Sequence, residues 1–431
     1  MTAHTSSVTL PAEPARLRPV QLAWLAGAIF VVSAGYGALL PLLPAWLTSM
    51  MPGATASEVA RHIGFLSGVY SAGVLVGAPL WGVVADRTGP GRVLIIGLVG
   101  YVASLLLMLV PALAGLWGIY ALRGTTGFFV AAVVPVVSAL VADYTPDEQR
   151  ARRFAWLSAM SLLGFLFGPG LGAVADWVGL WAGEGTASSA RSAQLVIVLS
   201  ALLGAVMMLG LAATLPASRV PEAAAQNHPV TSTEGRTTAL WCLSGAVMFV
   251  LAGFELGIVL QGQQHASLSS REIALMFAEC SLVMLGVNAL LFFTSLLEKT
   301  STRKLLGAGL ILAMVGLAVL VQHRSDAWMY LGVSLTSAGT GLVLPVIAYL
   351  AAGATRQTLG VTMGGLAAAA GLGQTLGSSV GGWLFGALAQ RSFGWLTLPL
   401  VAMLILLLAR PGWWPVIPAE SIRRPAGGSR F

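Results

Sequence analysis

Apolar and polar residues alternate along this chain in long blocks rather than residue by residue. The apolar blocks are about 20 residues or more in length, as an α-helix needs to cross the ~30 Å hydrocarbon layer of a bilayer. The pattern therefore predicts membrane-spanning helices joined by short loops. Twelve are expected, at residues 20–47, 62–85, 92–115, 117–142, 153–177, 191–214, 237–261, 272–297, 304–322, 327–350, 358–386 and 391–411.

A charged turn between two apolar blocks occurs twice in the chain. The first copy, between the second and third predicted spans, contains Asp86, Arg87 and Arg92. Residues of the same charge follow 212 positions later, without a gap, at Glu298, Lys299 and Lys304. The repeat indicates that two halves of the chain share one fold. Duplicated membrane bundles are typical of transporters, in which related halves surround one central site.

The longest polar stretch between spans covers residues 215–236 and divides the helices six and six. We interpret it as a flexible cytoplasmic linker. The expected fold is an all-α integral membrane protein with two pseudo-symmetric six-helix bundles. The predicted segments are an amino-terminal tail at 1–18, bundles at 19–214 and 237–411, and a carboxy-terminal tail at 412–431.

Composition agrees with a lipid environment, because 57% apolar and 9% charged residues leave too little polar surface for a soluble globule of this size. The net charge of +7 is spread over short loops, which argues against nucleic-acid binding. With the amino terminus inside, 17 basic residues fall on the cytoplasmic side and five outside. This asymmetry follows the positive-inside rule. Both termini are therefore expected in the cytoplasm, and the chain in a bacterial inner membrane.

Several kinds of activity are excluded by what the sequence lacks. It has no phosphate-binding loop for ATP, and no nucleophile, base and orienting group occur together, so we expect no enzyme. Cys242 and Cys280 lie in apolar runs without metal-ligand spacing. We therefore expect neither a cofactor nor a metal, and predict a monomer whose partners are a small-molecule substrate, protons and the lipid bilayer.

The first charged turn is expected to act as a latch at the cytoplasmic end. Asp86 can cap neighbouring helix amino termini and pair with a basic residue after the fourth span. The alternative is that the arginines only fix the topology. The residues of this predicted latch are Gly82, Asp86, Arg87, Gly89, Arg92, Arg150 and Arg152.

Small residues form a stripe along the fifth predicted span. Gly164, Gly168 and Gly172 recur every fourth residue, so they share one side of a helix and let another backbone approach closely. Pro169 removes one internal hydrogen bond and allows the helix to bend. We place this helix at the interface between the halves, and ordinary helix packing remains the alternative role of its glycines.

Three ionisable residues interrupt the predicted spans. Arg123 lies in the fourth span, where a guanidinium costs at least ~2.5 kcal/mol unless it faces a cavity or a partner. Snorkelling to the headgroups is the alternative. Glu255 and Glu279 lie in the antiparallel seventh and eighth spans at similar depth, and are potential neighbours.

An acidic site in these surroundings can hold either a proton or a cation, and so couple their opposite movements. The first predicted helix contains no competing acid, so we expect Glu255, and then Glu279, to carry the proton, assisted by Arg123. A purely structural role, satisfied by Arg123, Asn288 or a hydroxyl group, is the alternative for each acid. Tyr36 and Gln261 are candidate substrate contacts.

These patterns resemble the major facilitator superfamily, and within it the twelve-helix drug/proton antiporter group. The turn that begins at Gly82 is similar to the family's signature between the second and third helices, but departs from it at Pro90 and Gly91, where basic residues are common. Arg123 with Gly127 resembles the buried arginine motif. The glycine stripe of the fifth span resembles a signature of exporters. The resemblance implies alternating access around a cavity lined by the first, fourth, seventh and tenth helices.

Three functions remain open at this point. The leading hypothesis is a proton-coupled exporter of small amphipathic or cationic compounds. The second is a dedicated exporter of one metabolite, such as a siderophore, with the same machinery. The third is an uncoupled facilitator or a solute sensor. Loss of pH-dependent transport on neutralising Glu255 and Glu279 would favour the first two over the third.

Overall fold

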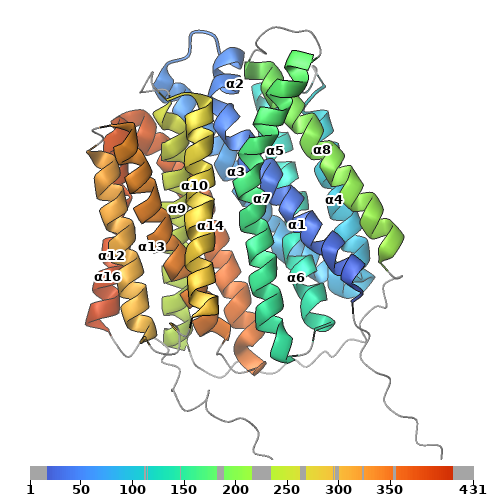
Figure 1. Ribbon diagram of the computed structural model, residues 1–431, viewed down its shortest axis with the longest axis vertical. Helices are drawn as coiled ribbons and strands as arrows, with labels where there is room; N and C mark the ends of the chain where they lie inside the picture. Colours follow the sequence, from blue (N-terminus) through green and yellow to red (C-terminus); the bar gives the residue numbers. More distant parts are fainter. Residues whose placement is uncertain are drawn as a thin grey trace, which may run out of the picture.

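The computed structural model describes residues 17–410 apart from 111–112, 114, 146, 182–188, 216–233, 263–267, 295, 297–299, 323–324 and 353–355. At some helical positions, Arg150 and Arg152 among them, only the backbone is described. The described part contains helices and no strand, and the long helices run side by side as one bundle (Figure 1).

In the described residues, eight α-helices form the first half of the chain. Helix α1 continues through one 3-10 turn, η1, into α2, and α5 is followed after a short turn by α6. The bounds are α1 Pro19–Leu39, η1 Leu40–Leu42, α2 Leu43–Met50, α3 Ala56–Thr88, α4 Pro90–Leu107, α5 Leu116–Val130, α6 Val134–Asp143, α7 Asp147–Trp181 and α8 Ser189–Thr214.

The second half repeats this pattern of long helices. Its last two long helices, α14 and α16, are joined by a 3-10 turn, η2, and the short helix α15. The bounds are α9 Glu234–Gln261, α10 Ser270–Phe293, α12 Thr302–Val321, α13 Asp326–Ala352, α14 Arg356–Leu388, η2 Ala389–Arg391, α15 Ser392–Trp395 and α16 Thr397–Ala409.

Ten stretches of the described chain are long and apolar enough to cross a membrane. One of them, Thr362–Ala409, contains most of α14 and all of α16, and accounts for two crossings. Helix α7 adds a shorter apolar stretch, Trp156–Gly172. The twelve predicted spans are thus all present as helices in the described residues, and the all-α membrane fold is confirmed.

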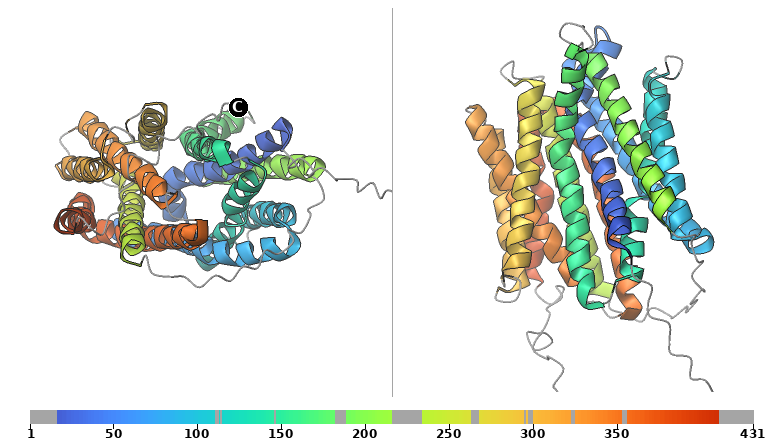
Figure 2. Two further views of the ribbon diagram at one scale, coloured as in Figure 1. Left: turned by 90° about the horizontal axis from the view of Figure 1, so that it is seen from below. Right: turned by 45° about the vertical axis from the view of Figure 1, so that its right-hand side comes forward.

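Viewed along the helices, the two halves gather on opposite sides of the molecule, blue to green against yellow to red (Figure 2). They touch where α3 packs against α14 and α7 against α10. The predicted linker and the two tails lie almost entirely outside the described residues, so the segment boundaries stay predictions.

One capping arrangement occurs at equivalent places in both halves. The Thr55 backbone N–H donates to Glu58 Oε2 (2.8 Å), and the Glu58 N–H donates to Thr55 Oγ1 (3.3 Å) at the start of α3. Ser269 and Glu272 form the same reciprocal pair at the start of α10. Such a capping box satisfies N–H groups that a helix start leaves unpaired. The internal repeat therefore extends to helix capping.

Glycines bring α3 and α14 into backbone contact. Gly64 faces Gly382, and a Cβ atom on Gly64 would lie 2.7 Å from the Gly382 Cα and 2.8 Å from the Ser378 carbonyl oxygen. A Cβ on Gly386 would lie 2.8 Å from the Ser57 carbonyl oxygen. We call this contact the glycine seam. It lies at the end of the bundle where α3 begins, here called the Glu58 end.

The opposite end of the bundle is where α3 ends, and is called the Asp86 end. There Gly89 adopts a φ of 93°, a conformation that glycine reaches without strain. It lets the chain turn directly from α3 into α4, whose first residue is Pro90. The fixed φ of proline suits the first position of a helix.

Candidate functional site

A cavity of about 370 Å³ lies between the two halves. Its walls come from α1, α3, α5, α6 and α7 of the first half and from α9, α10, α13 and α14 of the second. The first, fourth, seventh and tenth membrane crossings therefore all contribute to it, as the resemblance implied, together with four further helices.

Glu255 of α9 is the only ionisable carboxyl group among the described residues that line this cavity. Most of the surrounding side chains are aliphatic or aromatic, and the uncharged polar groups on the wall come from Ser33, Ser161, Ser281, Gln374, the Cys280 thiol and the hydroxyls of Tyr36 and Tyr70. An unpaired charge removed from water is costly. The site can therefore lower its free energy by binding a proton or a positively charged ligand at Glu255.

Aromatic rings line the part of the cavity wall that belongs to the first half. Tyr36 of α1 lies with its ring centroid 5.1 Å from that of Tyr70 and 5.9 Å from that of Phe165. Phe165 of α7 in turn lies 5.6 Å from Phe277 of α10, across the boundary between the halves. The Ser33 and Ser161 hydroxyls are 2.9 Å apart and join α1 to α7. The predicted substrate contact at Tyr36 thus belongs to a set of rings.

Arg123 of α5 is buried behind this aromatic wall, with 2% of its surface exposed. Its guanidinium carbon lies 4.7 Å from the centroid of the Tyr70 ring, which is the geometry of a cation–π contact. The Nε and Nη2 atoms have no hydrogen-bond partner among the described residues. The guanidinium is therefore next to the cavity, separated from it by Tyr70, and does not snorkel to the surface.

Glu279 of α10 does not line the cavity. The Ser334 hydroxyl of α13 donates a hydrogen bond to its Oε1, while Oε2 is buried and has no partner in the described structure. The next residue, Cys280, is buried and does line the cavity. The two candidate acids thus face different surroundings, one the central space and one the contact between α10 and α13.

The predicted latch residues lie at the Asp86 end. Gly82, Asp86, Arg87 and Arg92 are exposed there. Gly89 forms the buried turn described above. The side chains of two further predicted members, Arg150 and Arg152, lie outside the described residues. Pairing between Asp86 and these arginines stays a prediction.

The glycines of α7 pack against α1 within the first half. A Cβ atom on Gly164 would collide with the Phe30 carbonyl oxygen, and one on Gly168 would lie 2.7 Å from the Ala34 carbonyl oxygen. Gly172 has open space beside it, and Pro169 lies inside the helix. Helix α7 also meets α10 of the other half, through Phe165 rather than through the glycines.

Gln261 lies at the end of α9 and is only 1% exposed. Both polar atoms of its amide lack a hydrogen-bond partner among the described residues, and it does not line the cavity. Gln374 of α14 does line the cavity and was not predicted. An amide inside an apolar span was the signal for it, because polar groups in spans usually face a cavity.

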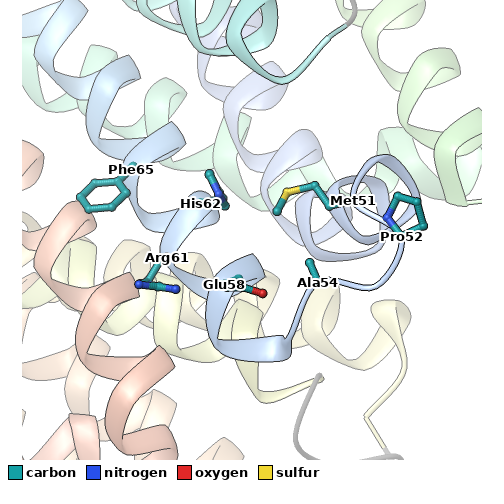
Figure 3. A pocket seen from close by; sticks show the side chains of 7 residues that line it. All are labelled: Met51, Pro52, Ala54, Glu58, Arg61, His62 and Phe65. Atoms are coloured by element: carbon teal, nitrogen blue, oxygen red, sulfur yellow. The ribbon is translucent and has the colours of Figure 1, made fainter.

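A second hollow, of about 490 Å³, lies at the Glu58 end (Figure 3). The loop after α2 supplies Met51, Pro52 and Ala54, and the first turns of α3 supply the other lining side chains, including Arg61 and Phe65. It shares no lining residue with the central cavity. No group of three or more His, Cys, Asp and Glu side chains suited to a metal ion occurs in the described residues.

Comparisons with known proteins agree on the kind of fold. Residues 25–291 match the family model of the Major Facilitator Superfamily. The crystal structure of the human organic anion transporter MFSD10 (TETRAN) superimposes with a TM-score of 0.71 at 18% identity, over 91% of this chain and 100% of that one. A peptide transporter, POT, in complex with sulfate gives 0.70 at 16% identity, over 91% and 94%.

Two relatives are similar in sequence over a part of their length. A class B tetracycline resistance protein of Escherichia coli is 34% identical over 144 residues, which are 33% of this chain and 34% of that protein. The quinolone resistance protein NorA of Staphylococcus aureus is 30% identical over 144 residues, 33% of this chain and 35% of NorA. The chain thus matches about a third of the length of these relatives.

Proposed function

Because this chain belongs to the major facilitator superfamily, a family of membrane transporters, we propose that it is a proton-coupled exporter of small amphipathic or cationic compounds. It works by alternating access: the two halves expose the central cavity first to one face of the membrane and then to the other. The energy comes from the proton gradient, and the substrate leaves the cell as a proton enters.

The observation that carries this proposal is the position of Glu255. It is the one carboxyl group on the described cavity wall, and it faces a space bounded by Tyr36, Tyr70 and Phe165. Aromatic faces attract organic cations, and a carboxylate compensates their charge. Binding of a cation and binding of a proton at Glu255 exclude each other, which is the condition for exchange of one for the other.

The glycine seam supports the alternating-access part of the proposal. It holds α3 and α14 together at the Glu58 end by backbone contacts, which an opening of that end would have to break. Proton binding at Glu255 removes a charge from the cavity and thereby changes the relative free energies of the two conformations. The relatives whose names include resistance to tetracycline and to quinolones are consistent with export of such compounds.

Inverted membrane vesicles that contain the full chain test the proposal. The probe is tetraphenylphosphonium, an aromatic cation, offered with and without an imposed pH gradient that is acidic inside. We expect uptake that depends on the gradient, and its loss in Glu255→Gln, because glutamine keeps the shape of the side chain but binds no proton. The matched control is Glu58→Gln, an acid at the start of α3 that lies outside the cavity.

Two outcomes would reject the proposal. Gradient-dependent uptake that persists in Glu255→Gln rules out proton coupling through this residue. Equal uptake with and without the gradient in the wild-type chain rules out proton coupling altogether and leaves an uncoupled facilitator. Transport of several unrelated cations would separate a broad exporter from one dedicated to a single metabolite.

A further inference from the structure

Polar side chains follow one face of α13 from the Glu58 end into the bundle. They recur every three or four residues, so they lie above one another on the side of the helix that packs against α10. Helices α10 and α13 are neighbours in the second half (Figure 1). The residues of this row are Asp326, Tyr330, Ser334 and Ser337.

The carboxyl group of Glu279, on α10, lies against the middle of this row, at Ser334. Ser334 donates a hydrogen bond to one of its oxygens, and the other oxygen is buried without a partner among the described residues. A carboxyl group that is left half satisfied inside a membrane protein is costly and is usually retained for a function. The Ser334 hydroxyl of α13 lies beside this carboxyl group, and the next residue of α10, Cys280, lies on the cavity wall.

Toward the Glu58 end, the row reaches the surface through Tyr330. This tyrosine lies one turn before Ser334 and is near enough to Glu272, Glu279 and Asp326 for all three carboxyl groups to act on it electrostatically. Glu272 caps the start of α10, and Asp326 begins α13, so both lie at the water-facing end of their helices. Glu279 is thereby connected to that end by a polar side chain at each turn.

Toward the cavity, the row ends at Ser337, and the neighbouring side chain is Cys280 of α10. Its thiol lies within interaction distance of the Ser337 hydroxyl, which is buried and has no partner of hydrogen-bond geometry among the described residues. Both Glu255 and Glu279 act electrostatically on this thiol. Cys280 lines the central cavity together with Glu255. Cys280 thus follows Glu279 in the chain and shares the cavity wall with Glu255.

Other titratable groups around Glu279 are few in the described structure. Helix α7 also packs on α10, but the one titratable side chain described on it is Arg153, at the Asp86 end. Helix α9 presents Glu255, and η1 presents none. Groups on α10 and α13 thus dominate the surroundings of Glu279.

We propose that the row between α10 and α13 is a proton path separate from the substrate path, in which Glu279 takes up a proton from the Glu58 end and passes it to Glu255. Each hydroxyl along the way, and the thiol of Cys280, releases one proton as it accepts another and ends unchanged. The net step protonates Glu255 and returns Glu279 to its carboxylate. This inference rests on the proposed role of Glu255 as the coupling acid.

The full chain reconstituted in proteoliposomes tests this path with tetraphenylphosphonium as the probe. In Glu279→Gln we expect uptake driven by a pH gradient to fall about tenfold, since one relay station is lost. Exchange of the probe across the membrane without a gradient, and its binding at fixed pH, should stay at wild-type values. Glu279→Asp should restore part of the gradient-driven rate. Ser334→Ala should slow it as well, whereas the matched control Ser104→Ala, a buried serine of α4, should not.

A purely structural role of Glu279 predicts a different result. Gradient-driven uptake and gradient-free exchange would then fall together in Glu279→Gln, and this outcome overturns the path. A wild-type rate in Glu279→Gln overturns it too, while loss of coupling in Glu255→Gln alone would leave the proposed function intact.

Infrared difference spectra between acidic and alkaline pH give a readout that needs no substrate. The wild-type chain should show carboxyl bands from both acids, and Glu279→Gln and Glu255→Gln should each remove a different one. Absence of any change in Glu279→Gln would show that this carboxyl group does not exchange protons, and would refute the path.

Discussion

Replacement of Gly64 by alanine should open the Glu58 end of the bundle. The added Cβ would lie 2.7 Å from the Gly382 Cα and 2.8 Å from the Ser378 carbonyl oxygen, both of them backbone atoms that no side-chain rotation can move away. Overpacking of this kind costs about 1–3 kcal/mol. The cost applies only to the conformation in which the seam is closed. The equilibrium should therefore shift toward the open conformation by about 5- to 150-fold.

The native thiol of Cys280 can report this shift, because it is buried on the cavity wall. In a Cys242→Ser background it becomes the only cysteine of the chain. A maleimide that cannot cross the membrane is added to intact cells, where the predicted topology places the Glu58 end outside. The labelling rate of Cys280 should rise about 5- to 150-fold in Gly64→Ala, in proportion to the open population.

The control for this experiment is Gly286→Ala in α10, where an added Cβ meets open space. It should label at the wild-type rate. Gly382→Ala should act in the same direction as Gly64→Ala, since the two glycines face each other. Equal labelling of Gly64→Ala and the wild-type chain would refute the view that the seam holds this end closed.

Three further predictions concern packing and capping, each measured as the thermal unfolding temperature in detergent. Gly164→Ala should lower the free energy of unfolding by about 1–3 kcal/mol, because the new Cβ collides with the backbone of α1. Gly170→Ala, where a Cβ meets open space, should keep the wild-type unfolding temperature. Equal unfolding temperatures for the two variants would contradict the tight packing of α7 on α1. Arg123→Lys should lower the free energy of unfolding by about 0.5–2 kcal/mol, because lysine lacks the planar guanidinium that lies over the Tyr70 ring. An unchanged unfolding temperature would argue against that contact. Thr55→Ala and Ser269→Ala should each lower the free energy of unfolding by about 0.5–2 kcal/mol, and by similar amounts, because each removes the same kind of helix cap. A lower unfolding temperature in only one of them would count against equivalent caps.

The membrane fold was predictable from the sequence because the thickness of the hydrocarbon layer sets the length of each span. The residues at which each span begins and ends were less predictable. The third span was predicted to reach residue 115, but α4 ends at Leu107. A row of apolar residues continues beyond that point, and hydrophobicity alone does not show where the backbone turns.

The site was only partly predictable. Glu255 and Glu279 look alike in sequence, since each is a single acid in an apolar run. Only the packing of helices distinguishes them, because it directs Glu255 to the cavity and Glu279 toward Ser334 of α13. The backbone contact of Gly64 with Gly382 joins residues more than 300 positions apart, and no local sequence pattern predicts it.

The glycine seam has a consequence for how the transporter responds to its environment. Gly64 meets Gly382, and Gly386 meets Ser57, through backbone atoms, and none of these residues carries an ionisable group. Such a closure is indifferent to ionic strength and to the membrane voltage, since neither acts on van der Waals contact. Any sensitivity of transport to salt or potential must then originate elsewhere in the molecule. The external factor that acts on this closure is the lipid composition, because the lateral pressure of the bilayer affects how closely helices pack.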